Sequence, residues 1–324
     1  MRKPPVFFIV GPTASGKTDA AVSAALAMNG EVVSADAIQI YRGLDKGSAK
    51  PDEEEMRGVP HHMIDIVDHD CCDYNVACFA KDASACIMDI VARGKTPIVA
   101  GGTGLYVNSL LYPLDFTEVK PDRKMRDDLL DQEEAMPGSL YARLKTVDPV
   151  TANRLHPNDI KRIVRALEVY YGTGRSLSEQ GGDFLNSRER EIPFEPVIAG
   201  ITMDRARLYD RINRRVDIML SNGLEEEARR LYDECGGEPP LSLQAIGYKQ
   251  FISYFMGEAS YDETVELIKR ETRRFAKRQI SWFKRDGRIR WFDAGNYEDK
   301  DALSRDIIRF FEEEKERIER TDEA

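Results

Sequence analysis

Short segments rich in apolar residues alternate with helical patterns along the first third of the chain. Strands are predicted at Val6–Val10, Glu31–Ala35 and Thr96–Ala100. Helical patterns lie between them, at Asp19–Met28 and Phe79–Arg93. Strands that alternate with helices in this way form parallel sheets with right-handed crossovers. The pattern therefore predicts an α/β fold, with a parallel sheet and helices on both of its faces.

The middle of the chain has a different pattern, because charged helical segments replace the strands. We expect helices at Asp122–Glu134, Ser139–Thr146 and Pro157–Tyr171. These lie in a mostly helical insertion domain, residues 119–190, between two parts of a core domain. The core domain comprises residues 1–118 and 191–324.

The strand pattern returns after the insertion. An apolar run at residues 196–201 predicts a strand that rejoins the parent sheet. It is followed by one long amphipathic helix, Asp204–Glu234, and later by a short strand at Arg290–Asp293. The last dozen residues are expected to form a frayed, charged helix.

Length and composition narrow the class of protein. The chain has 324 residues, a net charge of −10 and five cysteines. The cysteines show no paired CxxC spacing, which argues against a zinc site and against a disulfide framework. The first residues do not resemble a signal peptide, and no apolar stretch reaches the roughly 18 residues that span a bilayer. We expect a cytoplasmic, monomeric enzyme with reduced thiols and no membrane partner.

The acidic total hides a local basic segment. Residues 269–290 contain ten basic residues and two acidic ones, a net charge of +8. Phe275, Trp282 and Phe283 are interleaved with the charges, so one helix face could pack while the other follows phosphates. A solvated helix face is the ordinary alternative for such a run. We favour contact with nucleic acid, because a basic stripe is its electrostatic signature.

A complete phosphate-binding loop, GPTASGKT, joins the first predicted strand to the first predicted helix. Backbone N–H groups of such a turn and of the helix N-terminus favour an anion. Lys17 adds a positive charge, and the Thr18 hydroxyl is a candidate ligand of Mg²⁺, the expected cofactor. The loop alone leaves open which phosphorylated ligand is bound. Its candidate ligand-binding residues are Gly11, Thr13, Ala14, Ser15, Gly16, Lys17 and Thr18.

Three further segments could contribute chemistry. Asp36 follows the second strand beside the phosphate loop, where a carboxylate could be a general base, a magnesium ligand or a helix cap. The turn Gly101–Gly104 offers amides and the Thr103 hydroxyl to a phosphate, but it could equally be an ordinary tight turn. Arginines at helical spacing follow the returning strand, and one of them could reach a pyrophosphate. They are Arg207, Arg211, Arg214 and Arg215.

Taken together, these segments resemble the tRNA dimethylallyltransferases, also called tRNA isopentenyltransferases. The resemblance runs along nearly the whole chain, and the order and spacing of its segments make it specific. The matching segments are Gly11–Thr18, Ser34–Pro51, Val59–Asp65, Ala100–Tyr106, His156–Gly174, Arg215–Ala228, Gln244–Gln250 and Ala276–Arg285. Because the C-terminal part carries no Cys/His zinc motif, the chain is similar to bacterial members.

The resemblance implies a P-loop NTPase-like core and transfer of a dimethylallyl group from dimethylallyl diphosphate. The acceptor would be the exocyclic amine, N6, of adenosine 37 in tRNA, and diphosphate would leave. The phosphate loop would thus hold the leaving group without hydrolysing a nucleotide. Asp36 would accept the proton of the attacking amine, and Thr103 and Arg215 would help to bind the diphosphate.

The resemblance also implies contacts with the anticodon stem-loop of tRNA, which the helical insertion would clasp. One position departs from the family pattern, because Ala37 replaces the usual Ser, and loss of that hydroxyl could weaken a contact with the base. The implied tRNA-binding residues are Asp36, Ala37, Ile38, Gln39, Thr103, Lys161, Arg162, Ile163, Val164, Arg165, Gln244, Gly247, Tyr248, Lys249, Lys277, Arg278, Gln279, Trp282 and Lys284.

Three other functions compete with this interpretation. A P-loop small-molecule kinase or NTPase explains the phosphate loop but not the second half of the chain. A non-catalytic RNA-binding module would make Asp36 dispensable. A prenyltransferase that acts on free adenine nucleotide is the nearest rival, and the basic segment favours a polynucleotide acceptor instead.

Overall fold

The computed structural model describes residues 3–71, 73–112, 123–179, 191–236 and 240–321. They form two compact units. We call Met1–Leu111 with Pro193–Ala324 the core unit, and Tyr112–Ile192 the insertion unit. The boundaries expected after residues 118 and 190 lie within or at the edge of the residues that are not described.

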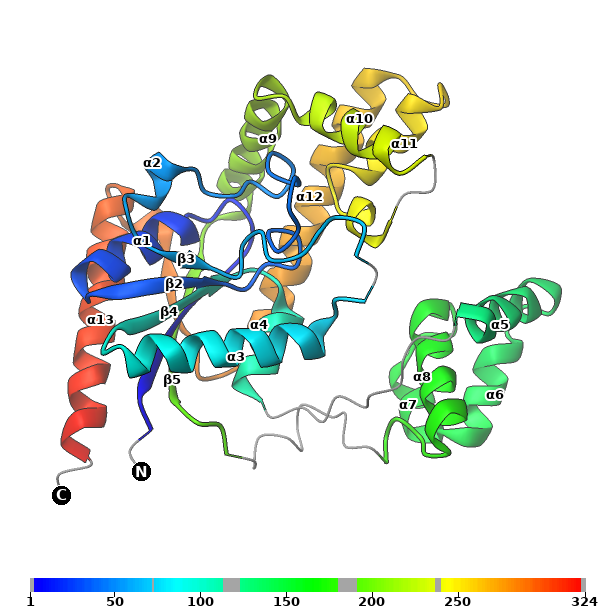
Figure 1. Ribbon diagram of the computed structural model, residues 1–324, viewed down its shortest axis with the longest axis horizontal. Coiled ribbons are helices and arrows are strands. Elements are labelled where there is room, and N and C mark those ends of the chain that lie inside the picture. The colour runs from blue at the N-terminus through cyan, green and yellow to red at the C-terminus, as the bar shows by residue number, and fades with distance from the viewer. Residues whose placement is uncertain (1–2, 72, 113–122, 180–190, 237–239, 322–324) are drawn as a thin grey trace. The chain divides into compact units, whose positions relative to one another are not determined.

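A parallel sheet forms the centre of the core unit (Figure 1). Its six strands have the order β3-β2-β4-β1-β5-β6, and every neighbouring pair is parallel. The α/β class predicted from the alternating pattern is confirmed, and the returning strand pairs with β1. The strands are β1 (Pro5–Val10), β2 (Gly30–Ser34), β3 (His61–His62), β4 (Thr96–Gly101), β5 (Glu195–Thr202) and β6 (Arg290–Asp293).

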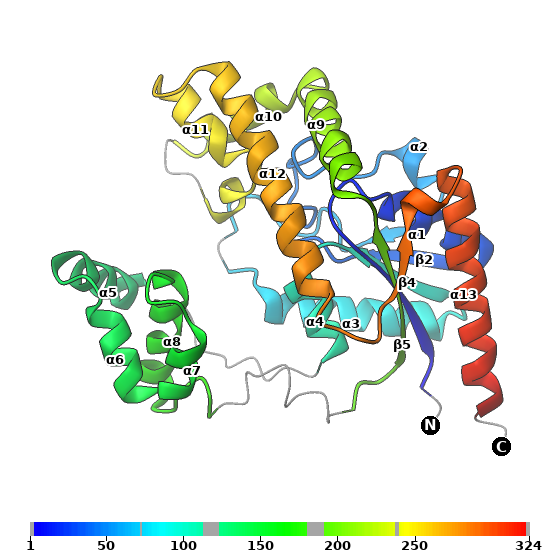
Figure 2. The ribbon, with the colours of Figure 1, turned by 180° about the vertical axis from the view of Figure 1, so that it is seen from behind.

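Helices cover both faces of the sheet, with α1 and α13 on one side and α3 and α4 on the other (Figures 1 and 2). Because strand side chains alternate, Phe7 and Ile9 point to the same face, where they share a core cluster with residues of α1 and α13. The helices of the core unit are α1 (Lys17–Ala27), α2 (Glu53–Met56), α3 (Val76–Ala92), α4 (Gly104–Leu111), α9 (Arg205–Ser221), α10 (Leu224–Glu234), α11 (Lys249–Phe255), α12 (Tyr261–Phe283) and α13 (Lys300–Thr321).

The structure corrects one predicted element. The single helix expected over Asp204–Glu234 is two helices, α9 and α10, separated by Asn222 and Gly223. Gly223 has φ 93° and stands immediately before α10. This left-handed conformation suits glycine, and it interrupts the helix that the amphipathic pattern alone would continue.

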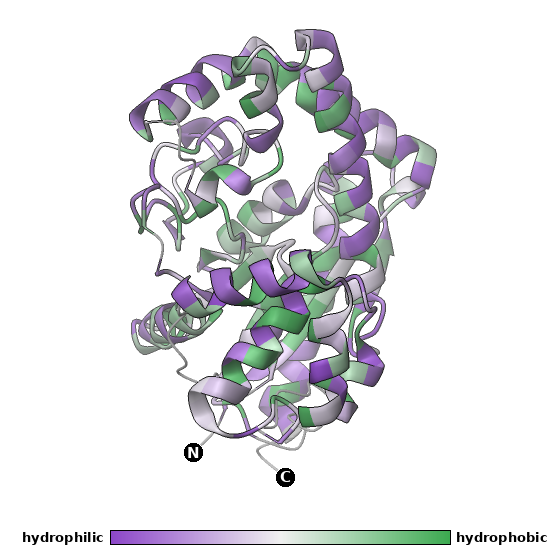
Figure 3. Cartoon of the chain, turned by 90° about the vertical axis from the view of Figure 1, so that its right-hand side faces the viewer, coloured by the Kyte–Doolittle hydropathy of each residue, from purple (hydrophilic) through white to green (hydrophobic). Residues whose placement is uncertain are grey.

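The insertion unit is a small helical bundle, as its charged helical patterns predict. Its apolar core includes Leu140, Leu144, Ile163 and Leu167. The helices are α5 (Arg123–Ala135), α6 (Ser139–Val147), α7 (Pro149–Arg154) and α8 (Ile160–Thr173). In Figure 3 the helices carry hydrophobic and hydrophilic residues on different sides, as expected of helices packed on a core. Among the described residues, no helix is both long and apolar enough to cross a membrane.

Candidate active site

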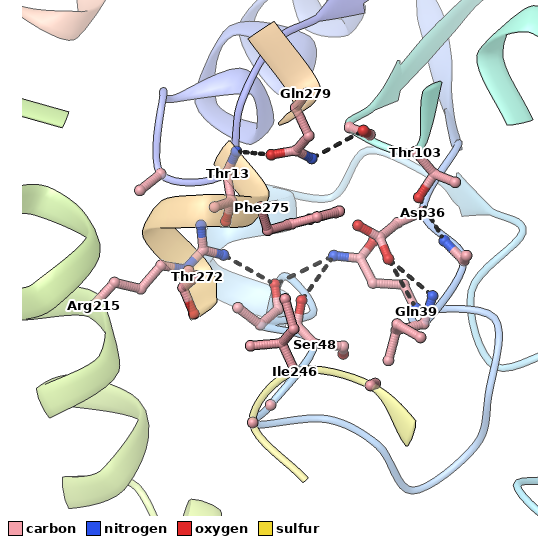
Figure 4. A pocket seen from close by; sticks show the side chains of 18 of the residues that line it. Thr13, Asp36, Gln39, Ser48, Thr103, Arg215, Ile246, Thr272, Phe275 and Gln279 are labelled. Atoms are coloured by element: carbon pink, nitrogen blue, oxygen red, sulfur yellow. Dashed lines mark hydrogen bonds between the residues drawn. The ribbon is translucent and has the colours of Figure 1, made fainter. Parts of the chain in front are cut away.

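The carboxyl ends of β1, β2 and β4 open into a cavity of about 430 Å³ within the core unit (Figure 4). This is where open α/β sheets bind their ligands. The end of β4, the start of α1 and the loops after the three strands contribute lining residues from segments 13–18, 36–39 and 100–103. The remaining lining comes from segments 47–49 and 244–247 and from helices α9 and α12.

The phosphate loop forms the end of this cavity next to β1. Gly11 needs to be a glycine, because a Cβ there would lie 2.5 Å from the carbonyl oxygen of Ile201. Gly16, with φ 97°, turns the chain into α1, whose first residue is Lys17. The first N–H groups of a helix have no partner within it, so the start of α1 can donate to an anion. The loop therefore has the geometry of a phosphate site.

Two half-buried cationic side chains, Lys17 and Arg215, line the cavity together with the carboxylate of Asp36. Burial and the nearby Arg215 lower the pKa of Lys17 to about 7, although Asp36 opposes this change. Burial also lowers the pKa of Arg215, against the opposing charges of Glu55 and Asp36. Lys17 Nζ donates to the carbonyl oxygen of Pro12 at 2.7 Å. The cavity is short of negative charge, and an anionic ligand would stabilise both cations.

Asp36 follows β2, and its described hydrogen bonds are those of a cap, one of the three roles considered for it. Its Oδ1 atom accepts hydrogen bonds from the backbone N–H groups of Ile38, at 2.9 Å, and Gln39, at 3.5 Å. This contact fixes the turn after the strand, as a cap would. Both described bonds reach the same oxygen, Oδ1, and Asp36 lines the cavity.

Thr103 is tied to the loop that carries Asp36. Its Oγ1 atom accepts a hydrogen bond from the Ala37 N–H at 3.0 Å, and its own N–H donates to the Ala35 carbonyl oxygen at 3.3 Å. Because the backbone of residue 37 makes this contact, the contact does not depend on whether Ser or Ala stands there. Thr103 lines the cavity as expected, and it also fixes the position of the Asp36 loop.

Comparisons with known proteins agree with this geometry. The family model described as IPP transferase matches residues 39–286. The chain belongs to this family. A tRNA dimethylallyltransferase of Pelotomaculum thermopropionicum is 45% identical over 309 residues, which cover 95% of this chain and 96% of the relative. One of Desulforudis audaxviator is 43% identical, with 96% and 99% covered.

Solved structures of this kind of enzyme are similar as well. The full-length tRNA isopentenylpyrophosphate transferase of Bacillus halodurans has 38% identity and a TM-score of 0.74, with both chains covered completely. A eukaryotic dimethylallyltransferase acting on tRNA has 30% identity and a TM-score of 0.76, over 94% of this chain and 78% of the other.

The structure brings most of the predicted site residues of the core unit to one cavity. Among the described residues, its lining includes Thr13, Ala14, Lys17, Thr18, Asp36, Ala37, Ile38, Gln39, Thr103, Arg215, Gln244, Gly247, Arg278 and Gln279. Gly11, Ser15 and Gly16 shape the phosphate loop behind this lining. Three predicted lysines are exposed to solvent and lie on α11, on α12 and directly after α12. They are Lys249, Lys277 and Lys284.

Other predicted RNA contacts have different surroundings. Ile163 and Val164 are 0% and 4% exposed and pack inside the insertion unit, because α8 turns its apolar side to the core. Tyr248 is also buried, and its hydroxyl donates to Glu227 at 2.6 Å. Burial removes these three side chains from direct contact with RNA, contrary to the expectation. Lys161 and Arg162 are exposed.

Sequence reasoning missed the apolar part of the lining. Residues at spacings of three and four along α9 and α12 turn toward the cavity, a periodicity that cannot be told from that of ordinary core positions. They are Ile212, Val216 and Met219 on α9, and Ile268, Thr272 and Phe275 on α12.

Glu227 was missed as well. Its carboxylate accepts hydrogen bonds from the backbone N–H groups of Asp45, Lys46 and Gly47, which lead into the segment 47–49 of the lining. Only the folded chain shows that α10 holds this loop.

Proposed function

We propose that this chain transfers a dimethylallyl group from dimethylallyl diphosphate to N6 of adenosine 37 in tRNA, with release of diphosphate. One observation carries the proposal. A single cavity joins a phosphate loop and two cations to the carboxylate of Asp36 and to an apolar wall. A prenyl diphosphate donor needs the phosphate loop and cations for its diphosphate and the apolar wall for its prenyl group. An amine acceptor needs the carboxylate to take its proton.

The diphosphate end of the donor belongs at the phosphate loop. The N-terminus of α1, Lys17 and Arg215 stabilise negative charge as it grows on the departing oxygens. Mg²⁺ fits this site, since the Thr18 hydroxyl and the diphosphate offer only oxygen ligands. Among the described residues, no cluster of three His, Cys, Asp or Glu competes for the metal. The ion, when bound, neutralises part of the charge on the leaving group.

The acceptor amine belongs on the Asp36 side. An aromatic amine is a weak nucleophile, so a carboxylate within hydrogen-bond reach of its proton helps the attack. As the new N–C bond forms, the C–O bond of the donor breaks and its electron pair leaves with diphosphate. The amine proton passes to Asp36. The adenine must first leave the stack of the anticodon loop to enter the cavity.

RNA binding fits the exposed cations around this cavity and on the insertion unit. Lys277, Arg278 and Lys284 belong to the basic segment, and all three are exposed. In the insertion unit, Lys161 and Arg162 are exposed on α8. Phosphate contacts of this type bind and orient RNA without reading its sequence. We expect the enzyme to work as a monomer in the cytoplasm, with the insertion unit clasping the anticodon stem.

The decisive assay supplies Mg²⁺, labelled dimethylallyl diphosphate and unmodified tRNA. Label should enter tRNA without ATP. Labelling of free AMP, with none in tRNA, would instead identify a nucleotide prenyltransferase. Phosphate release from ATP, with no use of the prenyl donor, would identify a kinase or NTPase.

A further inference from the structure

Gln279 lies on the inward side of α12, between two loops of the active site. Its Oε1 atom accepts a hydrogen bond from the Thr13 N–H at 2.8 Å. Its Nε2 atom donates to the carbonyl oxygen of Gly102 at 2.9 Å. The residue is only 5% exposed. One amide group therefore bridges the phosphate loop and the turn after β4, as Figure 4 shows.

Two glycines let α12 come this close. A Cβ at Gly102 would lie 2.2 Å from Gln279 Nε2, and a Cβ at Gly104 would lie 2.3 Å from the Trp282 ring. Contacts this short do not occur with real side chains. The turn thus has a shape that receives Gln279 and Trp282, one helical turn apart on α12, and the helix is seated on it at two points.

The bridge continues from Gly102 to the carboxylate. The next residue, Thr103, accepts the N–H of Ala37 and donates its own N–H to Ala35. These two residues flank Asp36. A chain of hydrogen bonds consequently runs from the phosphate loop through Gln279 to the loop that carries Asp36.

We infer that Gln279 is a positioning residue that fixes the separation between the diphosphate site and Asp36. The inference rests on the proposed function, in which the prenyl carbon departs from the diphosphate site and Asp36 takes the proton of the acceptor amine. Transfer needs both loops within a narrow range of positions, and a displacement of about 1 Å can slow an enzyme about 100-fold. Gln279 acts from inside the protein, whereas its neighbour Lys277, which the resemblance also places among the tRNA contacts, is exposed.

The amide is the group that this position requires. It must accept a hydrogen bond from Thr13 and donate one to Gly102, and glutamine does both with one planar group. In Gln279→Met the shape is similar but both bonds are lost. In Gln279→Glu the bond from Thr13 can persist, while a carboxylate oxygen faces the Gly102 carbonyl oxygen.

The test compares these two variants with Lys277→Met, a substitution of an exposed residue on the same helix. Three quantities are measured: the single-turnover transfer rate at saturating tRNA and donor, the Kd for tRNA, and the folded fraction at the assay temperature. We expect Gln279→Met to lower the rate about 10- to 100-fold, with Gln279→Glu also slow and Kd for tRNA within about twofold for both. Lys277→Met should raise Kd for tRNA, the quantity that the Gln279 variants leave nearly unchanged.

Three results would overturn the inference. The first is a saturated rate within about twofold of wild type in Gln279→Met. The second is a loss confined to Kd for tRNA, which would make Gln279 an RNA contact. The third is a fall in rate that equals the loss of folded protein in both variants. If Gln279→Met does not fold, Gln279→Glu decides alone.

Binding of inorganic diphosphate to the RNA-free protein separates this inference from the proposed function. The Gln279 variants should bind diphosphate several-fold more weakly than wild type, even if the acceptor is not tRNA. Equal affinity would contradict the positioning role. Absence of transfer to tRNA by the wild-type protein would contradict the proposed function alone.

Discussion

Helices α8 and α12 carry the same local pattern, an exposed Lys–Arg pair followed by a buried residue, but they cover different interiors. On α8, Lys161 and Arg162 precede Ile163, which packs into the apolar core of the insertion unit. On α12, Lys277 and Arg278 precede Gln279, whose amide bridges two loops of the cavity. The exposed side of each helix is suited to RNA phosphates. The buried side decides whether the helix also takes part in the reaction.

Charge follows the same division. In the insertion unit, Glu168 is 1% exposed and pairs with Arg165 at 3.2 Å and with Arg126 at 2.6 Å. These charges are compensated and serve stability. In the cavity of the core unit, burial and a neighbouring arginine, Arg215 for Lys17 and Arg211 for Arg215, lower the pKa of both cations, so both would gain from an anion. A basic residue therefore indicates a site for an anionic ligand only where no acidic side chain of the protein already compensates its charge.

The largest expected effect is at Asp36, on the catalytic side of this contrast. Asp36→Asn keeps an oxygen that can accept from the Ile38 N–H but removes the base. Turnover should fall about 10²- to 10⁴-fold, the usual contribution of a general base. Single-turnover kinetics measure the loss, and filter binding should give a tRNA affinity close to wild type. Near-normal turnover would contradict the base role.

Glu168→Gln tests the structural side. The change weakens hydrogen bonds between charged partners, which contribute about 1.5–3 kcal/mol each, and it should loosen the insertion unit. Hydrogen exchange should rise in α8 and stay unchanged in α1. Binding of diphosphate to the core unit serves as the control and should not change. An equal rise of hydrogen exchange in α8 and α1 would mean that the stability of the core unit depends on Glu168 as well.

The charge of Lys17 should make diphosphate binding depend on pH. With a pKa of about 7, Lys17 is mostly neutral above that pH in the free protein, and a bound diphosphate favours its protonated form. Binding above pH 7 therefore takes up a proton, and affinity should fall by up to about tenfold per pH unit relative to Lys17→Arg, which stays charged. Calorimetry in buffers of different ionisation enthalpy measures the uptake. Identical pH profiles for the two proteins would exclude this explanation.

The smallest effects are expected for exposed lysines of α8 and α12, and the two helices should give effects of similar size. Lys161→Met and Lys277→Met should each reduce the slope of log affinity for tRNA against log salt by about 1. Lys81→Met, on the exposed side of α3, is the matched control and should leave the slope unchanged. A change at one helix only would show that the other does not contact RNA.

The fold could be predicted from the sequence because its signals are local. The apolar runs that became β1, β2, β4 and β5 precede turns or helices, and periodicity identified α5, α6 and α8 of the insertion unit but not the short helix α7. The break at Gly223 was missed, since an amphipathic pattern continues across it. A single glycine inside a periodic pattern does not show by itself whether the backbone is left-handed there.

The candidate site was predictable where a motif implies its own geometry, as it does for Gly11–Thr18 and Asp36. It was not predictable where function depends on pairing across the fold. Gln279 lies 266 residues from Thr13, and only the packed structure shows that they share a hydrogen bond. Tyr248 and Val164 stand within motifs associated with RNA, yet burial gives them structural roles.

The most direct test of the central claim uses a donor labelled in both the prenyl group and the diphosphate. It is given to the wild-type protein with two tRNA transcripts that differ only in adenosine or guanosine at position 37. We predict one diphosphate released for each prenyl group incorporated into the adenosine transcript, and no incorporation into the other. Equal incorporation into both transcripts, or diphosphate release without incorporation, would contradict the proposal. That proposal is that one cavity holds the diphosphate donor, Asp36 and adenosine 37 for a direct transfer.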